Sequence, residues 1–72
     1  MQIVAVLAQS FDPKTGEKTG EPRWETIDLE ENVLFKDCQT ILDVHDCYES
    51  FWNRINDNPS ELVFVREVKV LS

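Results

Sequence analysis

Apolar residues dominate the first stretch of the chain and occupy both of its faces when it is read as a β-strand. All six residues from Ile3 to Ala8 are apolar. With the two-residue period of a strand, one face carries Ile3, Ala5 and Leu7, and the other carries Val4, Val6 and Ala8. A strand that is apolar on both faces is typical of the centre of a sheet. The pattern therefore predicts a central strand over residues 2–11.

A loop and a second, more acidic strand follow. Residues 12–22 contain both glycines and two of the three prolines, which predicts a mobile hairpin loop. Residues 23–31 alternate as a strand, with Ile27 and Leu29 on the face toward the core and Trp24 on the other face or at the loop junction. This segment contains four acidic residues, and charge of this kind discourages pairing between sheets. We therefore expect an edge strand.

The next segment has the period of a helix. Its apolar stripe consists of Ile41, Val44, His45, Tyr48, Phe51, Trp52 and Ile55. This spacing predicts an amphipathic helix over residues 37–55, with Asp37 or Thr40 as its N-cap, or a later start at Asp46. The sequence Asn-Asp-Asn-Pro at 56–59 is expected to end it. Residues 31–36 fit either a longer strand or the entry to the helix.

Residues 61–71 predict a third strand. On strict alternation, one of its faces carries Leu62, Phe64, Val68 and Val70. The whole chain, residues 1–72, is then one small α+β domain with the order β-β-α-β. The helix crosses the sheet and returns the chain so that the third strand pairs antiparallel with the first. We expect a three-stranded antiparallel sheet of order 2-1-3 with one helix packed on one face.

A single helix covers one face of such a sheet and leaves apolar side chains on the other. An exposed apolar strip is typical of an interface, and large aromatic residues often anchor one. We therefore expect the uncovered face, or the exposed edge of the third strand, to bind another protein or a second copy in a homodimer. The alternative is that the long loop folds back over this face. The candidate interface residues are Val4, Val6, Trp24, Val63 and Val65.

Charge suggests a second surface. The chain has a net charge of -7, and the segment 25–49, with eight acidic residues and only Lys36 as a base, accounts for all of it. Such a surface attracts a basic protein by electrostatic steering, or only keeps a small protein in solution. Phosphate and anionic membranes require clustered bases, so we expect no direct binding of nucleic acid or membrane. The acidic surface candidates are Asp28, Glu30, Glu31, Asp43, Asp46 and Glu49.

Candidate catalytic and metal-binding residues are few. His45 is the only histidine, and with Glu49 one helical turn away it makes two ligands, too few for structural zinc. Cys38 and Cys47 would face opposite sides of one continuous helix, too far apart for a disulfide. We therefore expect no enzyme activity, no metal and no cofactor, with His45 as a partly buried, hydrogen-bonded core residue and both cysteines reduced.

The expected function is that of a small non-catalytic protein-interaction module. The first strand has no basic leader and is too short for a signal segment or a membrane span, so a cytoplasmic location is expected. The β-β-α-β order resembles that of many small phage and mobile-element proteins that bind and inhibit host machinery, and this resemblance is one of architecture alone. The acidic region suggests an alternative function: an acidic inhibitor or nucleic-acid mimic of phage or mobile-element type that blocks a host nucleic-acid-binding protein.

Overall fold

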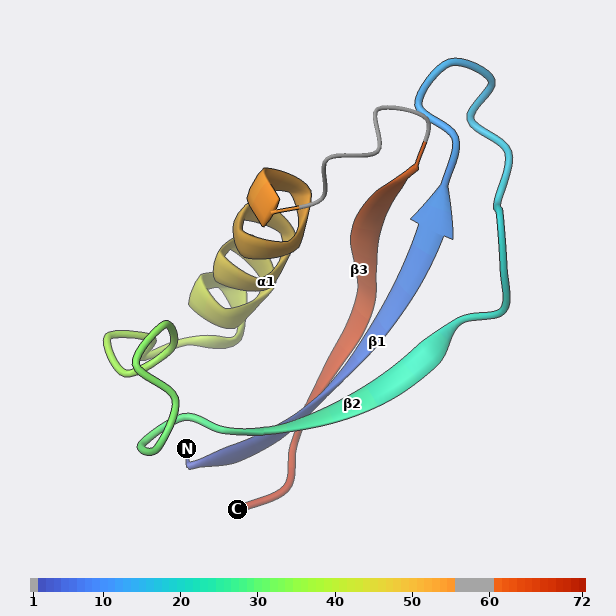
Figure 1. Cartoon of the computed structure of the whole chain (residues 1–72). Coiled ribbons are helices and arrows are strands. Elements are labelled where there is room, and N and C mark those ends of the chain that lie inside the picture. Colours follow the sequence, from blue (N-terminus) through green and yellow to red (C-terminus); the bar gives the residue numbers. More distant parts are fainter. Residues whose placement is uncertain (1, 56–60) are drawn as a thin grey trace.

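The computed structural model describes residues 2–55 and 61–72. Its elements are β1 (Ile3–Phe11), β2 (Arg23–Asp28), α1 (Ile41–Ile55) and β3 (Leu62–Val70). The strands form a twisted antiparallel sheet of order β2-β1-β3, and α1 crosses one face of it over β3 (Figure 1). This confirms the predicted class, element order and strand order. Within the described residues, no helix is long and apolar enough to cross a bilayer.

The helix begins at Ile41, because a cap at Thr40 rather than Asp37 fixes its first turn. The hydroxyl oxygen of Thr40 accepts a hydrogen bond from the Asp43 N–H at 3.1 Å, and the Asp43 carboxylate accepts the N–H groups of Gln39 and Thr40 at 3.0 and 3.1 Å. This reciprocal arrangement confirms Thr40 as the N-cap. Residues 29–40, called the connection below, form turns between β2 and α1. The predicted stop at 56–59 lies outside the described residues.

The cap makes the stability of the fold depend on pH in acid. Hydrogen bonds from the backbone of Gln39, and then of Thr40, lower the pKa of the Asp43 carboxyl. A carboxyl whose pKa is lower in the folded state stabilises the fold above its unfolded pKa, and this stabilisation is lost as the pH falls through the folded-state pKa. We therefore expect Asp43→Asn, which has no titrating group, to approach the wild type in stability as the pH falls from about 6 to about 2. Urea unfolding across this range measures it, and a constant stability difference would contradict it.

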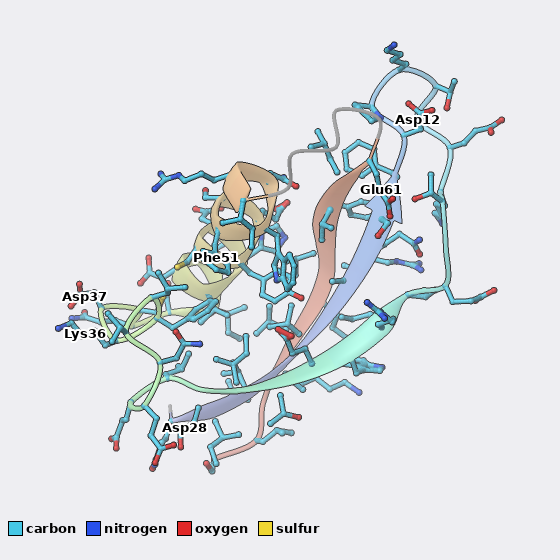
Figure 2. The ribbon with its side chains drawn as sticks, in the orientation of Figure 1. Asp12, Asp28, Lys36, Asp37, Phe51 and Glu61 are labelled. Carbon is cyan, nitrogen blue, oxygen red and sulfur yellow. The ribbon has the colours of Figure 1, made fainter. Side chains whose placement is uncertain are left out.

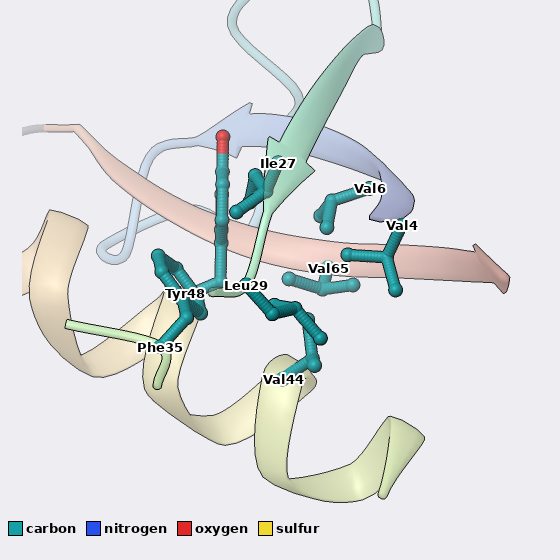
Figure 3. Packing of buried hydrophobic residues seen from close by; sticks show 8 residues of the cluster. All are labelled: Val4, Val6, Ile27, Leu29, Phe35, Val44, Tyr48 and Val65. Atoms are coloured by element: carbon teal, nitrogen blue, oxygen red, sulfur yellow. The ribbon is translucent and has the colours of Figure 1, made fainter. Parts of the chain in front are cut away.

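The core lies between α1 and the sheet (Figure 3). Val4 and Val6 of β1 are completely buried there, and Ile27 and Leu29 are buried from the β2 side, as predicted. The full cluster is Val4, Val6, Ile27, Leu29, Phe35, Val44, Tyr48 and Val65. Three of the proposed interface residues, Val4, Val6 and Val65, therefore lie beneath the helix. Their assignment to the uncovered face is wrong, because α1 packs on this face of β1 and shields these side chains from water.

A β-bulge decides which face the β3 side chains occupy. The register pairs Leu7 with Glu67 and Ala8 with Val65, so Arg66 is an extra residue in β3. An extra residue in a strand reverses the alternation beyond it. The helix side of β3 therefore carries Val63, Val65, Val68 and Val70, instead of the set expected from strict alternation. Val63, another of the proposed interface residues, is half-buried on the helix side of the sheet.

The uncovered face of the sheet carries Ile3, Ala5, Leu7, Phe11, Leu62 and Phe64. Trp24 lies on this face as predicted, paired with Leu7 and 49% exposed. The ammonium group of Lys69 lies 4.9 Å from the centre of the Trp24 ring, so this contact reaches from β3 to β2 across β1. The Lys69 and Trp24 side chains thus cover part of this face.

Gln9 attaches the hairpin loop to one end of the uncovered face. Its side chain is only 1% exposed, and its amide nitrogen donates hydrogen bonds to the carbonyl oxygens of Ser10 and Gly20. A bridge between Phe11 and Lys18 extends the antiparallel pairing into the loop. The 12–22 loop therefore contacts this face at Gln9, while the mobility expected of it stays a prediction.

Candidate functional site

A cavity of about 570 Å³ opens between β2, the connection and α1. It exists because α1 packs mainly against β3, so that aromatic side chains rather than helix backbone fill the space toward β2. We call it the aromatic–acidic groove and define it by Glu25, Asp28, Glu31, Phe35, Tyr48 and Trp52.

A second cavity of about 400 Å³ adjoins the groove. Glu25, Tyr48 and Trp52 line both cavities, and the second is completed by Arg23 and Trp24 together with loop and sheet residues. The hollow therefore follows β2 for its whole length and passes the Tyr48 and Trp52 rings on the way.

Three neighbouring aromatic rings, tilted relative to one another, line the groove. Tyr48 stands between Phe35, at a centroid distance of 6.5 Å, and Trp52, at 6.2 Å. Tyr48 is buried, whereas Trp52 is 36% exposed, so only the Trp52 ring offers a large surface to a ligand. Burial, and next the Glu25 carboxylate, raise the pKa of Tyr48 to about 12. The Tyr48 hydroxyl is hydrogen-bonded to the Glu25 side chain, and this contact holds Glu25 at the groove.

Acidic residues outnumber basic ones among the residues that line the groove. Glu25, Asp28 and Glu31 line the first cavity and Glu21 the second, whereas Arg23 is the one base among the lining residues of the two cavities. Aromatic faces and carboxylates both attract cations. The groove is therefore suited to a side chain with an apolar stem and a cationic head.

The predicted acidic residues lie in two parts of the fold, the end of β2 and helix α1. Asp28, Glu30 and Glu31 lie together at the end of β2, where an oxygen of Asp28 accepts the N–H groups of the other two at 3.0 and 3.4 Å. Figure 2 shows Asp28 near the end of the molecule that holds the connection, with Asp12 and Glu61 near the opposite end. The remaining three lie on α1 and serve other contacts, since Asp43 caps the helix and Asp46 and Glu49 flank His45.

His45 and Asn53 occupy the outer edge of β3. Nε2 of His45 lies 3.1 Å from the Val65 carbonyl oxygen, and Nδ1 lies 3.0 Å from Glu49. The Asn53 side chain donates to the Val63 carbonyl at 3.1 Å and accepts the Val63 N–H at 2.9 Å. The structure thus confirms the hydrogen bonding expected of His45, but it places the side chain at the sheet edge, 35% exposed, rather than in the core. The side chains of His45 and Asn53 block this part of the β3 edge, which the sequence had suggested as a docking edge.

The two cysteines are neighbours, contrary to the expectation that they face opposite sides of one helix. Cys38 precedes the helix, so the chain folds back and brings its thiol beside that of Cys47. Burial, and next the Cys47 thiol, raise the pKa of Cys38 to about 11, while the Cys47 thiol donates to the Leu34 carbonyl oxygen at 3.0 Å. Both cysteines are free. In the described ranges, no group of three or more His, Cys, Asp or Glu side chains is placed to hold a metal ion.

Sequence reasoning missed the groove, although it singled out most of its parts. Tyr48 and Trp52 were predicted as core residues from the helical stripe, and Glu25 was predicted as charge on an edge strand. These three side chains come together only because of the position at which α1 crosses the sheet. The sequence carries no signal for that position. Comparison of the chain with protein-family models, with curated proteins and with solved structures finds no match.

Proposed function

We propose that this protein is a non-catalytic interaction module that binds a basic segment of another protein in the aromatic–acidic groove. The observation that carries the proposal is that the Trp52 ring, which is 36% exposed, and Glu25 line the same cavity of about 570 Å³. A lysine or arginine side chain satisfies both, since its stem packs on the ring while its head meets the carboxylate. The excess of carboxylates at the rim disfavours phosphate and other anions.

Charge neutralisation in the groove tests this proposal. The probe is a synthetic peptide of about six residues with alternating valine and lysine, and its glutamate counterpart serves as a ligand control. We expect the basic peptide to quench or shift tryptophan fluorescence and to bind more weakly as salt increases. The double variant Glu25→Gln with Glu31→Gln is expected to weaken binding at least about tenfold, which is about 1.4 kcal/mol.

A matched variant separates the groove from general charge attraction. Asp46→Asn with Glu17→Gln removes the same charge outside the groove, at a side chain that is 83% exposed and at the hairpin loop. We expect this variant to bind the basic peptide nearly as well as the wild type. Equal losses in the two double variants, or equal binding of the glutamate peptide, would refute the groove as the site.

The acidic inhibitor inferred from the charge is a narrower form of the same proposal. A host protein that binds nucleic acid presents a basic surface, and the carboxylates of the groove would compete with phosphates for it. Competition with duplex DNA distinguishes this form. DNA displaces the protein from a partner whose basic segment binds nucleic acid, and it has no effect on a partner whose basic segment does not.

Self-association through the uncovered face is the second proposal. It is favoured by Trp24, which is 49% exposed beside the half-buried Leu7 on an apolar sheet face. Sedimentation equilibrium over a wide concentration range measures it. A dimer that dissociates on Trp24→Ala substitution would support this face, and a monomer at every concentration would refute it.

A further inference from the structure

We infer that the basic segment enters the groove as an extended strand and pairs with the free edge of β2, which makes the sheet four-stranded. This inference rests on the proposed function and specifies the conformation of the partner. Its basis is a difference between the two edges of the sheet, together with the charge beside one of them.

The backbone of β2 offers unpaired groups at its outer edge. The Leu29 N–H donates to the Gln2 carbonyl at 2.8 Å, so these two residues form a hydrogen-bonded pair of the antiparallel ladder. Hydrogen-bonded and non-hydrogen-bonded pairs alternate along such a ladder, which makes Val6–Glu25 a bonded pair as well. Trp24 and Thr26 belong to the non-hydrogen-bonded pairs on either side of Glu25, so they direct their N–H and C=O groups away from β1. No described residue pairs with β2 on that side.

The opposite edge of the sheet is closed where α1 crosses it. Asn53 binds both backbone groups of Val63, and His45 lies at the carbonyl oxygen of Val65. Val68 and Val70, beyond the bulge, line neither of the two cavities described above. The helix thus blocks the first half of the β3 edge, whereas the whole β2 edge runs beside the groove.

The side chains beside β2 select a basic strand. An added strand lies about 4.8 Å from β2, and every second side chain then points to the helix side, into the groove. Cationic heads at these positions meet Glu25 and the Trp52 ring, since Glu25 faces the helix from β2. Two copies pairing edge to edge would instead bring the same carboxylates together, which is unfavourable. The occupant is therefore an extended segment of another protein with lysine or arginine at alternate positions.

Amide hydrogen exchange with the valine–lysine peptide tests the pairing directly. We expect the peptide to slow exchange at the Thr26 N–H at least about tenfold and also at Trp24, while Glu25 and Ile27, already in the ladder, change little. The peptide itself supplies a matched pair of controls. N-methylation of one set of alternate amides should weaken binding at least about tenfold, because only every second amide faces β2. N-methylation of the other set should leave binding nearly unchanged.

The outcomes separate this inference from the proposed function. If the basic peptide binds and binding depends on Glu25 and Glu31, but neither β2 exchange nor N-methylation has an effect, the extended pairing is wrong and the groove remains the site. Protection at Val68 and Val70 instead would place the added strand on β3 and overturn the inference. If neither the basic peptide nor any N-methylated form binds, the proposed function fails, and the inference fails with it.

Discussion

Val6→Asp is expected to leave the chain unfolded near neutral pH and room temperature. Val6 is completely buried between the sheet and α1, in a cluster where its neighbours are apolar. An unpaired charge in such a place costs several kcal/mol, which is comparable to the total stability of about 5 kcal/mol expected at the lower end for small domains. Far-ultraviolet circular dichroism and thermal unfolding measure the loss.

Leu7→Asp is the matched control, since the adjacent residue lies half-buried on the uncovered face. We expect this variant to fold with a lower melting temperature, because its carboxylate keeps contact with water. If Val6→Asp folds and Leu7→Asp does not, then α1 covers the other face of β1. Neighbouring residues of a strand point to opposite faces, so the comparison of the two variants tests which face of β1 packs against α1.

Gln9→Glu is expected to destabilise the protein by roughly 3 kcal/mol near pH 7, by analogy with other uncompensated buried charges. The Gln9 amide nitrogen donates to two carbonyl oxygens while the side chain is almost fully buried. Glutamate in the same place brings a negative charge against both oxygens and lacks a donor. The hairpin loop would lose its attachment at Gly20, which unfolding measurements by urea detect as a lower midpoint.

The same variant should recover in acid. Burial and the two carbonyl oxygens favour the protonated carboxyl and so raise its pKa in the folded state above the unfolded value of about 4.3. The penalty is present above the folded-state pKa and is relieved as the pH falls from there toward the unfolded value. The stability difference from the wild type should therefore shrink in acid. A Gln9→Met variant, which cannot titrate, should keep a constant difference, and identical pH profiles for the two variants would contradict this account.

Local patterns in the sequence determined the elements and their order. The apolar run from Ile3 to Ala8 predicted the central strand, since a strand that is apolar on both faces is typical of the centre of a sheet. The helical stripe from Ile41 to Ile55 predicted α1, and Thr40 was one of its two expected caps. These signals are local, because a period of two or of 3.6 residues is set by the backbone geometry of the element itself. With one crossover they lead to the order 2-1-3.

The tertiary structure decided which side of each strand faces the helix. Both faces of β1 are apolar, so its pattern allows either orientation, and the choice depends on the packing of Val44 and Tyr48 against the sheet. In β3 the extra residue Arg66 reverses the alternation, and a bulge of this kind has no clear mark in the sequence. The first decision moved Val4 and Val6 from the proposed interface into the core, and the second brought Val68 and Val70 to the same side as Val65.

The candidate site is also a product of tertiary structure. The sequence identified Tyr48 and Trp52 through the helical period and Glu25 through edge-strand charge, but it placed them in separate roles. They meet because α1 lies over β3, held there by the hydrogen bonds of Asn53 and His45 to the β3 edge, which leaves the β2 side to aromatic side chains. Periodicity records which residues share a face of one element. The contacts between elements depend on the crossing position of the helix, and that position is set by packing and edge hydrogen bonds between residues far apart in the chain.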